Sequence, residues 1–340
     1  MTDLPFVSII IPCYNEEKYI AQCLDSIMAG DYPQDCMEIL VVDGRSTDRT
    51  RDVLVEYSKR HLVVRTVDNP HRLKPHALNI GIMKAKGEIL IRMDAHALYD
   101  KSYVSRCIRY LVEYEADNVG GIRKTLPTGS SVLARSIAAS ISSPFGAGNA
   151  TYRTGAKGFK WVDTVFGGCY RREIFRKIGL FNELLVRGQD REFNVRLQKA
   201  GGKILFAPDI VCHYYARGSL RAYLPWIYSG GLTPFYVTRL IGQRIYAWRN
   251  FIPMVFVLSL CVLLMLSLLH SIFMWIFTTE LGLYLCFSIF SAIPIAKREK
   301  GLGFLLSMPI VFFMTHVVYG VGSIIGLIKP LKRTAEWTQV

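Results

Sequence analysis

Short apolar runs alternate with helical stretches along the N-terminal half of the chain. Four runs have the length and continuous hydrophobicity of strands buried on both faces: Val7–Pro12, Glu38–Val42, Leu62–Val67 and Glu88–Met93. Helical periodicity follows the runs, at 17–28, 46–60, 76–86 and 102–115. This alternation predicts an α/β fold with a doubly wound, mostly parallel sheet and right-handed crossovers.

The pattern changes after the fourth helical stretch. Residues 126–160 are rich in Gly, Ser, Ala and Thr, and we expect a long, partly mobile insertion near the ligand crevice. A basic helix is expected at Arg171–Ile178, a further helix from Gly188 to about residue 201, and a last strand at Lys203–Ala207. The sequence thus predicts a first domain over residues 1–213.

The C-terminal part of the chain is much more apolar. Residues 251–277 and 301–328 contain no Asp, Glu, Lys or Arg, and each is long enough to cross a hydrocarbon layer of ~30 Å as a helix. Between them we expect a turn at Thr278-Thr279-Glu280 and a shorter second span. The predicted transmembrane region is 251–328, with spans at about 251–277, 278–296 and 302–328 and a basic tail at 329–340. A re-entrant third segment is the alternative, and Gly322-x-x-x-Gly326 predicts close helix packing there.

Positive charge is concentrated beside these spans. The 340-residue chain has a net charge of +14, and residues 210–279 contain five arginines but no Asp or Glu. Tyrosines and tryptophans accompany the arginines, which predicts an interfacial amphipathic segment at 214–250. No nucleic-acid motif is present, so we do not expect a nucleic-acid partner. The eight cysteines lack C-x-x-C spacing, which argues against a zinc site.

Asp94 and His96 follow the fourth predicted strand. Ligands bind parallel α/β sheets at the carboxyl ends of the strands, so these side chains are candidates for a site. Residues two apart in extended backbone point the same way, and a carboxylate and an imidazole could share one divalent cation. A nitrogen ligand favours Mn²⁺ over Mg²⁺. The alternative is that Asp94 caps a turn and His96 packs, but the position at a strand end favours a metal.

Other polar residues have two interpretations each. Asp43, at the end of the second strand, could accept a hydrogen bond from uracil or ribose, or it could be a turn residue before Gly44. Asp190 lies at a helix N-terminus, which favours an ionised carboxylate, so it could be a general base or only a favourable first-turn acid. Lys74 precedes the third helix and could face phosphates or lie in a solvated basic loop.

Four motifs in order carry a resemblance to a known family. They are VSIIIPCYNE at 7–16, VVDGRSTDRT at 41–50, Asp94-Ala95-His96, and Gln189-Asp190-Arg191-Glu192. Over about residues 6–215 the chain resembles family 2 glycosyltransferases. With its hydrophobic C-terminus, it is most similar to the succinoglycan-type exopolysaccharide enzymes. The resemblance implies a GT-A fold and inverting transfer of a sugar from a nucleotide sugar, which we expect to be a UDP-sugar.

The resemblance also implies roles for individual residues. Pro12, Asn15, Glu16 and Asp43 would hold the nucleoside, Asp94 and His96 would occupy the D-x-D metal position, and Asp190 would be the base. Two departures stand out: the D-x-D motif ends in histidine, and the usual Glu-Asp pair reads Gln189-Asp190.

The resemblance further indicates how the enzyme would act. The Q-x-x-R-W motif of processive synthases is missing, so we expect one transfer per encounter. The expected acceptor is a lipid-linked saccharide at the cytoplasmic face of the inner membrane, with Arg217 and Arg221 as acceptor contacts. The alternatives are a polyprenyl-phosphate sugar synthase and a non-catalytic, membrane-anchored nucleotide-sugar binder.

Overall fold

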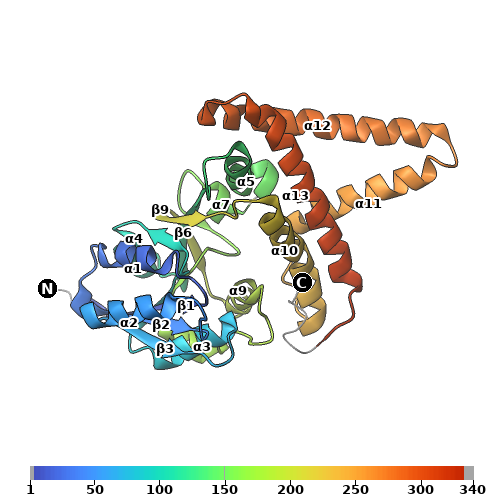
Figure 1. Ribbon diagram of the computed structural model, residues 1–340. Helices are drawn as coiled ribbons and strands as arrows, with labels where there is room; N and C mark the ends of the chain where they lie inside the picture. The colour runs from blue at the N-terminus through green and yellow to red at the C-terminus, as the bar shows by residue number, and fades with distance from the viewer. Residues whose placement is uncertain (1–3, 149, 333–340) are drawn as a thin grey trace. The chain divides into compact units, whose positions relative to one another are not determined.

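A computed structural model describes residues 4–148 and 150–332 (Figure 1). The chain divides into two compact units, each of which is described by itself. The sheet unit contains residues 1–124 and 155–214, and the helical unit contains residues 125–154 and 215–340. The predicted first domain at 1–213 was continuous, whereas here an internal segment groups with the C-terminal helices.

The strands are β1 (Val7–Cys13), β2 (Met37–Asp43), β3 (Val64–Asp68), β4 (Ile89–Arg92), β5 (Ala97–Tyr99), β6 (Asn118–Leu126), β7 (Lys160–Trp161), β8 (Cys169–Arg171) and β9 (Ile204–Tyr215). The helices of the sheet unit are α1 (Ile20–Met28), α2 (Thr50–Arg60), α3 (Lys74–Lys84), α4 (Tyr103–Glu113), α8 (Arg172–Ile178) and α9 (Gln189–Lys199), with a 3₁₀ turn at Gln34–Cys36.

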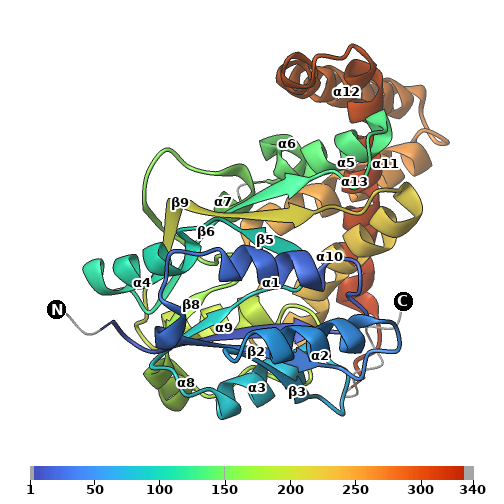
Figure 2. The same ribbon diagram turned by 60° about the vertical axis from the view of Figure 1, so that its left-hand side comes forward.

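The sheet is parallel in its first half and antiparallel in its second. Its order is β3-β2-β1-β4-β8-β6-β9-β5, and β7 also pairs with β9. Strands β1 to β4 pair in parallel, while β8 runs antiparallel to β4 and β6, and β9 runs antiparallel to β5 and β7. Figure 2 shows α2 and α3 beside β2 and β3.

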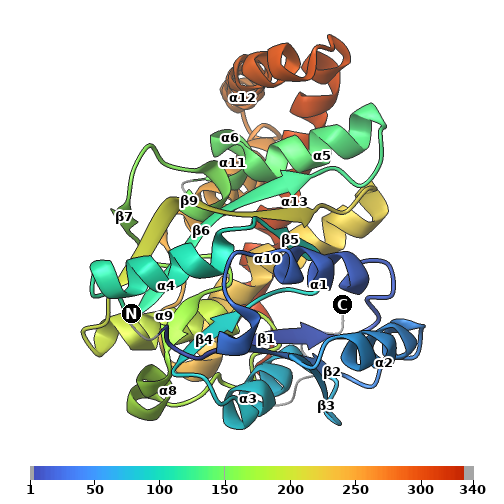
Figure 3. The same ribbon diagram turned by 90° about the vertical axis from the view of Figure 1, so that its left-hand side faces the viewer.

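Strand β1 is apolar throughout because both of its faces are covered. Ile9 and Ile11 belong to the core that also contains Leu24 of α1. Ile10 points to the opposite face, where an added Cβ on Gly81 of α3 would lie 2.4 Å from its Cγ2 atom. Helices α1 and α3 accordingly lie on opposite sides of β1 (Figure 3). This double coverage explains why the strand does not alternate between apolar and polar residues.

The antiparallel half was not predicted. Strand β8 has three residues, and β6 contains Gly120 and Gly121, which weaken its strand signal. An added Cβ on Gly121 would lie 1.9 Å from the carbonyl oxygen of Ile210 in β9, so glycine is required where these strands approach. The last strand is also longer than the predicted Lys203–Ala207 and continues to Tyr215.

The helical unit consists of α5 (Val132–Ser142), α6 (Pro144–Ala147), α7 (Thr151–Thr154), α10 (Leu220–Ile241), α11 (Phe251–Leu266), α12 (Ser271–Glu299) and α13 (Gly303–Ile328), with a 3₁₀ turn at Trp248–Asn250. Within residues 4–148 and 150–332, three helical segments are long and apolar enough to cross a membrane: Trp248–Leu266, Ser271–Glu299 and Gly303–Ile328. The predicted tail at 329–340 lies outside the described residues from position 333 onward.

The turn between the first two spans is not where the sequence predicted it. Thr278 and Glu280 lie inside α12, and the connection is at residues 267–270, visible in Figure 1 as the short link between α11 and α12. His270 caps α12 by accepting a hydrogen bond from the amide of Ile272 (3.1 Å). Glu280 is a good helix former and does not interrupt α12, and Ser259 of α11 donates a hydrogen bond to its carboxylate (2.6 Å).

The segment 126–160, expected to be a long, partly mobile insertion, contains the helices α5, α6 and α7, which the sequence analysis did not predict. Ser131 caps α5 by accepting a hydrogen bond from the amide of Ala134 (3.1 Å). Ile137 and Ile141 pack in one apolar cluster with Val311 of α13. The small residues that indicated a loop instead allow α5 to pack closely within the helical unit.

Helices α10 and α13 pack through glycines. An added Cβ on Gly231 would lie 2.0 Å from the carbonyl oxygen of Tyr319, and one on Gly322 would lie 2.3 Å from that of Tyr228. Gly326 is equally restricted by α10, where the carbonyl oxygen of Leu232 would lie 2.5 Å away. Small residues thus permit close backbone contact, as the glycine spacing indicated.

Candidate active site

Asp94 lies directly beyond β4 and is held by two cations. Its Oδ1 atom accepts hydrogen bonds from Nη2 of Arg92 and from Nζ of Lys74, both at 2.7 Å. The side chain is only 8% exposed. Burial opposes ionisation, but Arg92, Lys74 and then His96 outweigh it and hold the pKa of Asp94 well below its usual range. The carboxylate is therefore ionised at neutral pH.

Arg92 also contacts Asp190, although the two residues are far apart in sequence. Its Nη1 atom lies 3.0 Å from Oδ2 of Asp190, which is in the first turn of α9. Gly188 begins this helix with a φ of 81°, a conformation that favours glycine. The buried Oδ1 atom of Asp190 has no hydrogen-bond partner among the described residues. One guanidinium thus joins Asp94 to Asp190, whose side chain is 30% exposed.

His96 forms a second group with Glu16 and Tyr214. Its Nδ1 atom lies 2.7 Å from Oε1 of Glu16, and its Nε2 atom lies 3.1 Å from the Tyr214 hydroxyl. Burial of the ring opposes protonation, but the Glu16 hydrogen bond, Tyr214 and Asp94 outweigh it and raise the pKa of His96 to about 9. The ring adds positive charge beside Asp94 at neutral pH.

Asp43 organises the loop after β2. The carboxylate is 1% exposed, accepts a hydrogen bond from the Ser46 hydroxyl (2.5 Å), and pairs with Nε of Arg51 (2.7 Å). The Ser46 hydroxyl in turn accepts a hydrogen bond from the amide of Asn15 (2.9 Å). A nucleoside contact to Asp43 would use the remaining lone pairs of a carboxylate that already orders this loop.

The predicted site residues of the sheet unit therefore lie along one connected path at the carboxyl ends of β1, β2 and β4. Pro12 is paired with Val42 at the end of β1, and Asp43 connects through Ser46 to Asn15. Glu16, the next residue, binds His96. Lys74 and Arg92 then surround Asp94, and Arg92 reaches Asp190.

The other two predicted residues, Arg217 and Arg221, belong to the helical unit. Both are exposed, and the guanidinium of Arg217 lies 5.6 Å from the centre of the Trp226 ring. Their expected role as acceptor contacts stays a prediction.

Asp94 and His96 are suitable ligands for a divalent cation that takes only a few of its ligands from the protein. Both cations that bind Asp94 use Oδ1, so Oδ2 is the oxygen that can coordinate a metal. Glu16 on Nδ1 is the carboxylate partner that metal-binding histidines usually have, so a metal would use Nε2, which lies 3.1 Å from the Tyr214 hydroxyl in this structure. A metal would compete with a proton on that nitrogen. In the described part of the chain no group of three or more His, Cys, Asp or Glu side chains could hold a metal.

The sequence did not reveal the connecting residues. Arg92 lies two positions before Asp94 on the same strand, and this i, i+2 spacing was the available signal. A buried arginine at a strand end requires carboxylates around it, which would have pointed to Asp190. The contacts of Tyr214 with His96 had no sequence signal, because they depend on pairing between β5 and β9.

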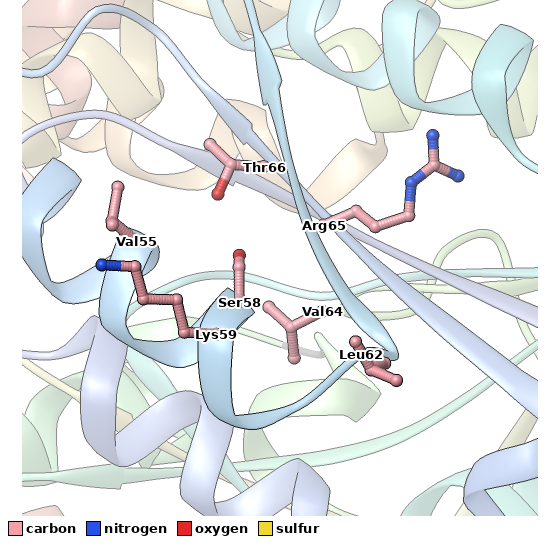
Figure 4. Close-up of a pocket in the computed structure, with 7 residues that line it drawn as sticks. All are labelled: Val55, Ser58, Lys59, Leu62, Val64, Arg65 and Thr66. Atoms are coloured by element: carbon pink, nitrogen blue, oxygen red, sulfur yellow. The ribbon is translucent and has the colours of Figure 1, made fainter.

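A cavity of about 540 Å³ lies elsewhere in the sheet unit, between α2 and β3 (Figure 4). Its lining includes Ser58 and Lys59 of α2 and Arg65 and Thr66 of β3. None of the predicted site residues lines it, so we treat it as separate from the site at the carboxyl ends.

The fold and the placement of the acidic residues define the class as a GT-A glycosyltransferase. The chain belongs to glycosyl transferase family 2, whose family model matches residues 8–179. It is similar to a dolichyl N-acetyl-alpha-D-glucosaminyl phosphate 3-beta-D-2,3-diacetamido-2,3-dideoxy-beta-D-glucuronosyltransferase of Methanococcus voltae, with 31% identity over 95% of this chain and 98% of the relative.

Two further similarities cover different parts of the chain. Succinoglycan biosynthesis protein ExoA of Rhizobium meliloti is 31% identical over 65% of this chain and 66% of its own length. Among solved structures, the mannosyltransferase PcManGT from Pyrobaculum calidifontis, in complex with GDP-Man and Mn²⁺, matches with a TM-score of 0.59 and 23% identity over 96% of this chain and 88% of its own. At that identity the structural likeness shows the fold.

Proposed function

We propose that the protein transfers one sugar, with inversion, from a nucleotide sugar to a lipid-linked saccharide at the cytoplasmic face of the membrane. The observation that carries this proposal is the contact of Arg92 with both Asp94 and Asp190. It brings the carboxylate of the D-x-D position and a second, partly exposed carboxylate into one site. These are the two groups that inverting transfer requires.

The reaction forms one bond and breaks one bond. The acceptor hydroxyl oxygen attacks the anomeric carbon, while the bond from that carbon to the phosphate oxygen breaks and its electron pair leaves with the nucleoside diphosphate. Asp190, whose side chain is 30% exposed and is held by Arg92, takes the hydroxyl proton. Lys74 adds positive charge on the side where the diphosphate leaves.

A divalent cation belongs to this proposal as a cofactor. Asp94 and His96 would hold it, and the solved mannosyltransferase contains Mn²⁺. When bound, the cation carries part of the negative charge of the leaving diphosphate. The imidazole ligand favours Mn²⁺ over Mg²⁺. With two protein ligands, we expect the nucleotide to complete the coordination, so that the cation binds weakly without it.

The acceptor and the location rest on the helical unit and on the relatives. The M. voltae relative is named for a dolichyl-linked N-acetylglucosaminyl phosphate acceptor, and ExoA for succinoglycan biosynthesis. Among the described residues, three helices are apolar enough to span a membrane. Lys297 and Arg298 lie in the last turn of α12, and the positive-inside rule favours a cytoplasmic position for this end. We therefore propose a multi-pass inner-membrane enzyme with a cytoplasmic site.

The test is transfer by the purified protein in nanodiscs with added Mn²⁺. Several UDP- and GDP-sugars are offered with either bare prenyl phosphate or prenyl-linked N-acetylglucosamine, and products are identified by mass spectrometry. Addition of one sugar to the saccharide acceptor is the expected result. Addition to bare prenyl phosphate alone would favour a polyprenyl-phosphate sugar synthase. Nucleotide-sugar binding without any product would indicate a non-catalytic binder.

A further inference from the structure

The helical unit is almost free of acidic residues. In its described part the only Asp or Glu residues are Glu280 and Glu299. Glu280 accepts a hydrogen bond from Ser259 (2.6 Å), and Glu299 pairs with Arg135 (2.5 Å). Glu299 also pairs with Arg298 (3.2 Å), so both of these carboxylates are engaged, while the described part of the unit contains many more arginines than acids.

Arg153 of α7 is one of the partly buried arginines of this unit. Its Nε atom donates a hydrogen bond to the Tyr152 hydroxyl (3.1 Å), and its guanidinium carbon lies 5.5 Å from the centre of the Trp226 ring. Tyr223 and Tyr319 are close enough to interact with it electrostatically. A guanidinium withdrawn from water among aromatic rings is most stable when an anion completes its hydrogen bonds.

Arg217 lies against the same ring. Its guanidinium carbon is 5.6 Å from the centre of Trp226. The two guanidinium carbons are therefore at most about 11 Å apart. Cation–π contacts with Trp226 hold both arginines in place, but they do not neutralise two positive charges gathered at one ring. The pair has the composition of a phosphate-binding site, in which arginine donates paired hydrogen bonds to oxyanions.

The ring that connects the arginines is attached to a candidate membrane span. Trp226 lies on α10, and the hydroxyl of Tyr223 on that helix is 3.0 Å from Oγ1 of Thr315 on α13. The glycine contacts of Gly231 with Tyr319 hold α10 and α13 at short distance. An anion bound at this cluster is thus bound within the unit that carries the apolar spans, which favours a phosphate joined to an apolar chain.

We propose that Arg153 and Arg217, which share the ring of Trp226, bind the phosphate group of a prenyl-linked acceptor. This inference rests on the proposed function, whose acceptor it names by its phosphate and its apolar chain. The arginines bind and orient the acceptor, and Trp226 positions the arginines. A free phosphate ion or an anionic headgroup of the bilayer carries the same charge, so the test must separate these sources.

The test measures binding of farnesyl phosphate to the full-length protein in phosphatidylcholine nanodiscs. Each of Arg153→Gln and Arg217→Gln is expected to weaken binding about tenfold, since each removes charge-assisted hydrogen bonds. The matched control is Arg244→Gln, because Arg244 also lies on an aromatic ring of this unit, 4.8 Å from the centre of Tyr246, but outside the cluster. Its affinity should equal that of wild type. An equal loss in the control would overturn the site in favour of general charge attraction.

Three further arms identify the ligand. Farnesol should bind much more weakly than farnesyl phosphate, and equal binding would overturn recognition of an anion. Inorganic phosphate should compete poorly, because it lacks the apolar chain, and displacement at the same concentration as farnesyl phosphate would assign the site to free phosphate. If the substitutions matter only when phosphatidylglycerol is added to the nanodiscs, the arginines bind bilayer headgroups and the acceptor assignment fails.

UDP and GDP binding on the same samples separates this inference from the proposed function. The glutamine variants should bind nucleotide as wild type does. If a glutamine variant fails to fold, Arg153→Lys provides a second variant. It keeps the positive charge and should therefore bind farnesyl phosphate more tightly than Arg217→Gln does. Equally weak binding by these two variants would count against the site. If the wild-type protein binds farnesyl phosphate but no nucleotide, the proposed function is refuted, whereas the phosphate site is not.

Discussion

Replacing Arg92 with lysine tests the contact on which the proposed mechanism depends. Arg92 is 5% exposed, and it uses two different nitrogens, at 2.7 Å from Asp94 and 3.0 Å from Asp190. A lysine ammonium is a single point charge and cannot reproduce this planar fork. We expect it to stay with the more deeply buried Asp94 and to release Asp190.

The expected decrease in the transfer rate follows from the lost contact between residue 92 and Asp190. A hydrogen bond to a charged group contributes about 1.5–3 kcal/mol, which corresponds to roughly a 10- to 150-fold change in rate if it is used in the transition state. Asp190 accepts its proton only during the reaction, so the loss should appear in kcat at saturating donor, with little change in the affinity for nucleotide.

The assay is steady-state sugar transfer by Arg92→Lys, with nucleotide binding measured separately. Arg51→Lys is the control, since Arg51 pairs with buried Asp43 through one nitrogen at 2.7 Å and with the exposed Asp68 at 3.3 Å, but has no contact with Asp190. The control should retain wild-type kcat. Wild-type kcat in Arg92→Lys would refute the reasoning, and so would a defect confined to nucleotide affinity.

The remaining predictions concern other parts of the chain. Asp43→Asn should weaken UDP binding about tenfold by calorimetry, through loss of a charged acceptor; unchanged affinity would remove Asp43 from the nucleoside site. The folded-state pKa of His96 is raised to about 9, so its stabilising contribution is present below the ordinary pKa of about 6.5 and is lost as pH rises through about 9. With a metal chelator present, Tm of wild type should therefore fall at alkaline pH, whereas Tm of His96→Gln should not. Parallel curves of Tm against pH for the two proteins would contradict this prediction. Gly231→Ala should lower Tm because its Cβ would lie 2.0 Å from the Tyr319 carbonyl oxygen, whereas Gly282→Ala, with nothing within 4 Å, should not; equal Tm values would argue against the close packing. Chelation of divalent cations should abolish transfer, with Mn²⁺ restoring more activity than Mg²⁺.

The parallel half of the sheet could be predicted because burial on both faces makes its strands continuously apolar. The antiparallel strands could not, since β8 is very short and the glycines of β6 are required by the approach of β9, a contact that local sequence does not reveal. The helices at 132–154 were missed for a similar reason. Their alanines and serines have a weak local signal, and their stability depends on packing within the helical unit.

The site shows the same division between local and long-range information. That Asp94 and Asp190 could meet follows from the rule that ligands bind at the carboxyl ends of strands. That Arg92 would join them depends on how α9 is placed against β4, which no sequence pattern specifies. Likewise, the D-x-D position ending in His96 was visible in the sequence, but its partner Glu16 comes from the end of another strand.

The most direct test of the account is the single-turnover rate of Asp190→Asn with saturating nucleotide sugar and acceptor. Asparagine keeps the shape of the side chain but is a poor proton acceptor. The account predicts that the variant binds nucleotide with wild-type affinity and transfers sugar at least about a hundredfold more slowly, as expected for loss of general base catalysis. A variant that transfers sugar at the wild-type rate would contradict the assignment of Asp190 as the base.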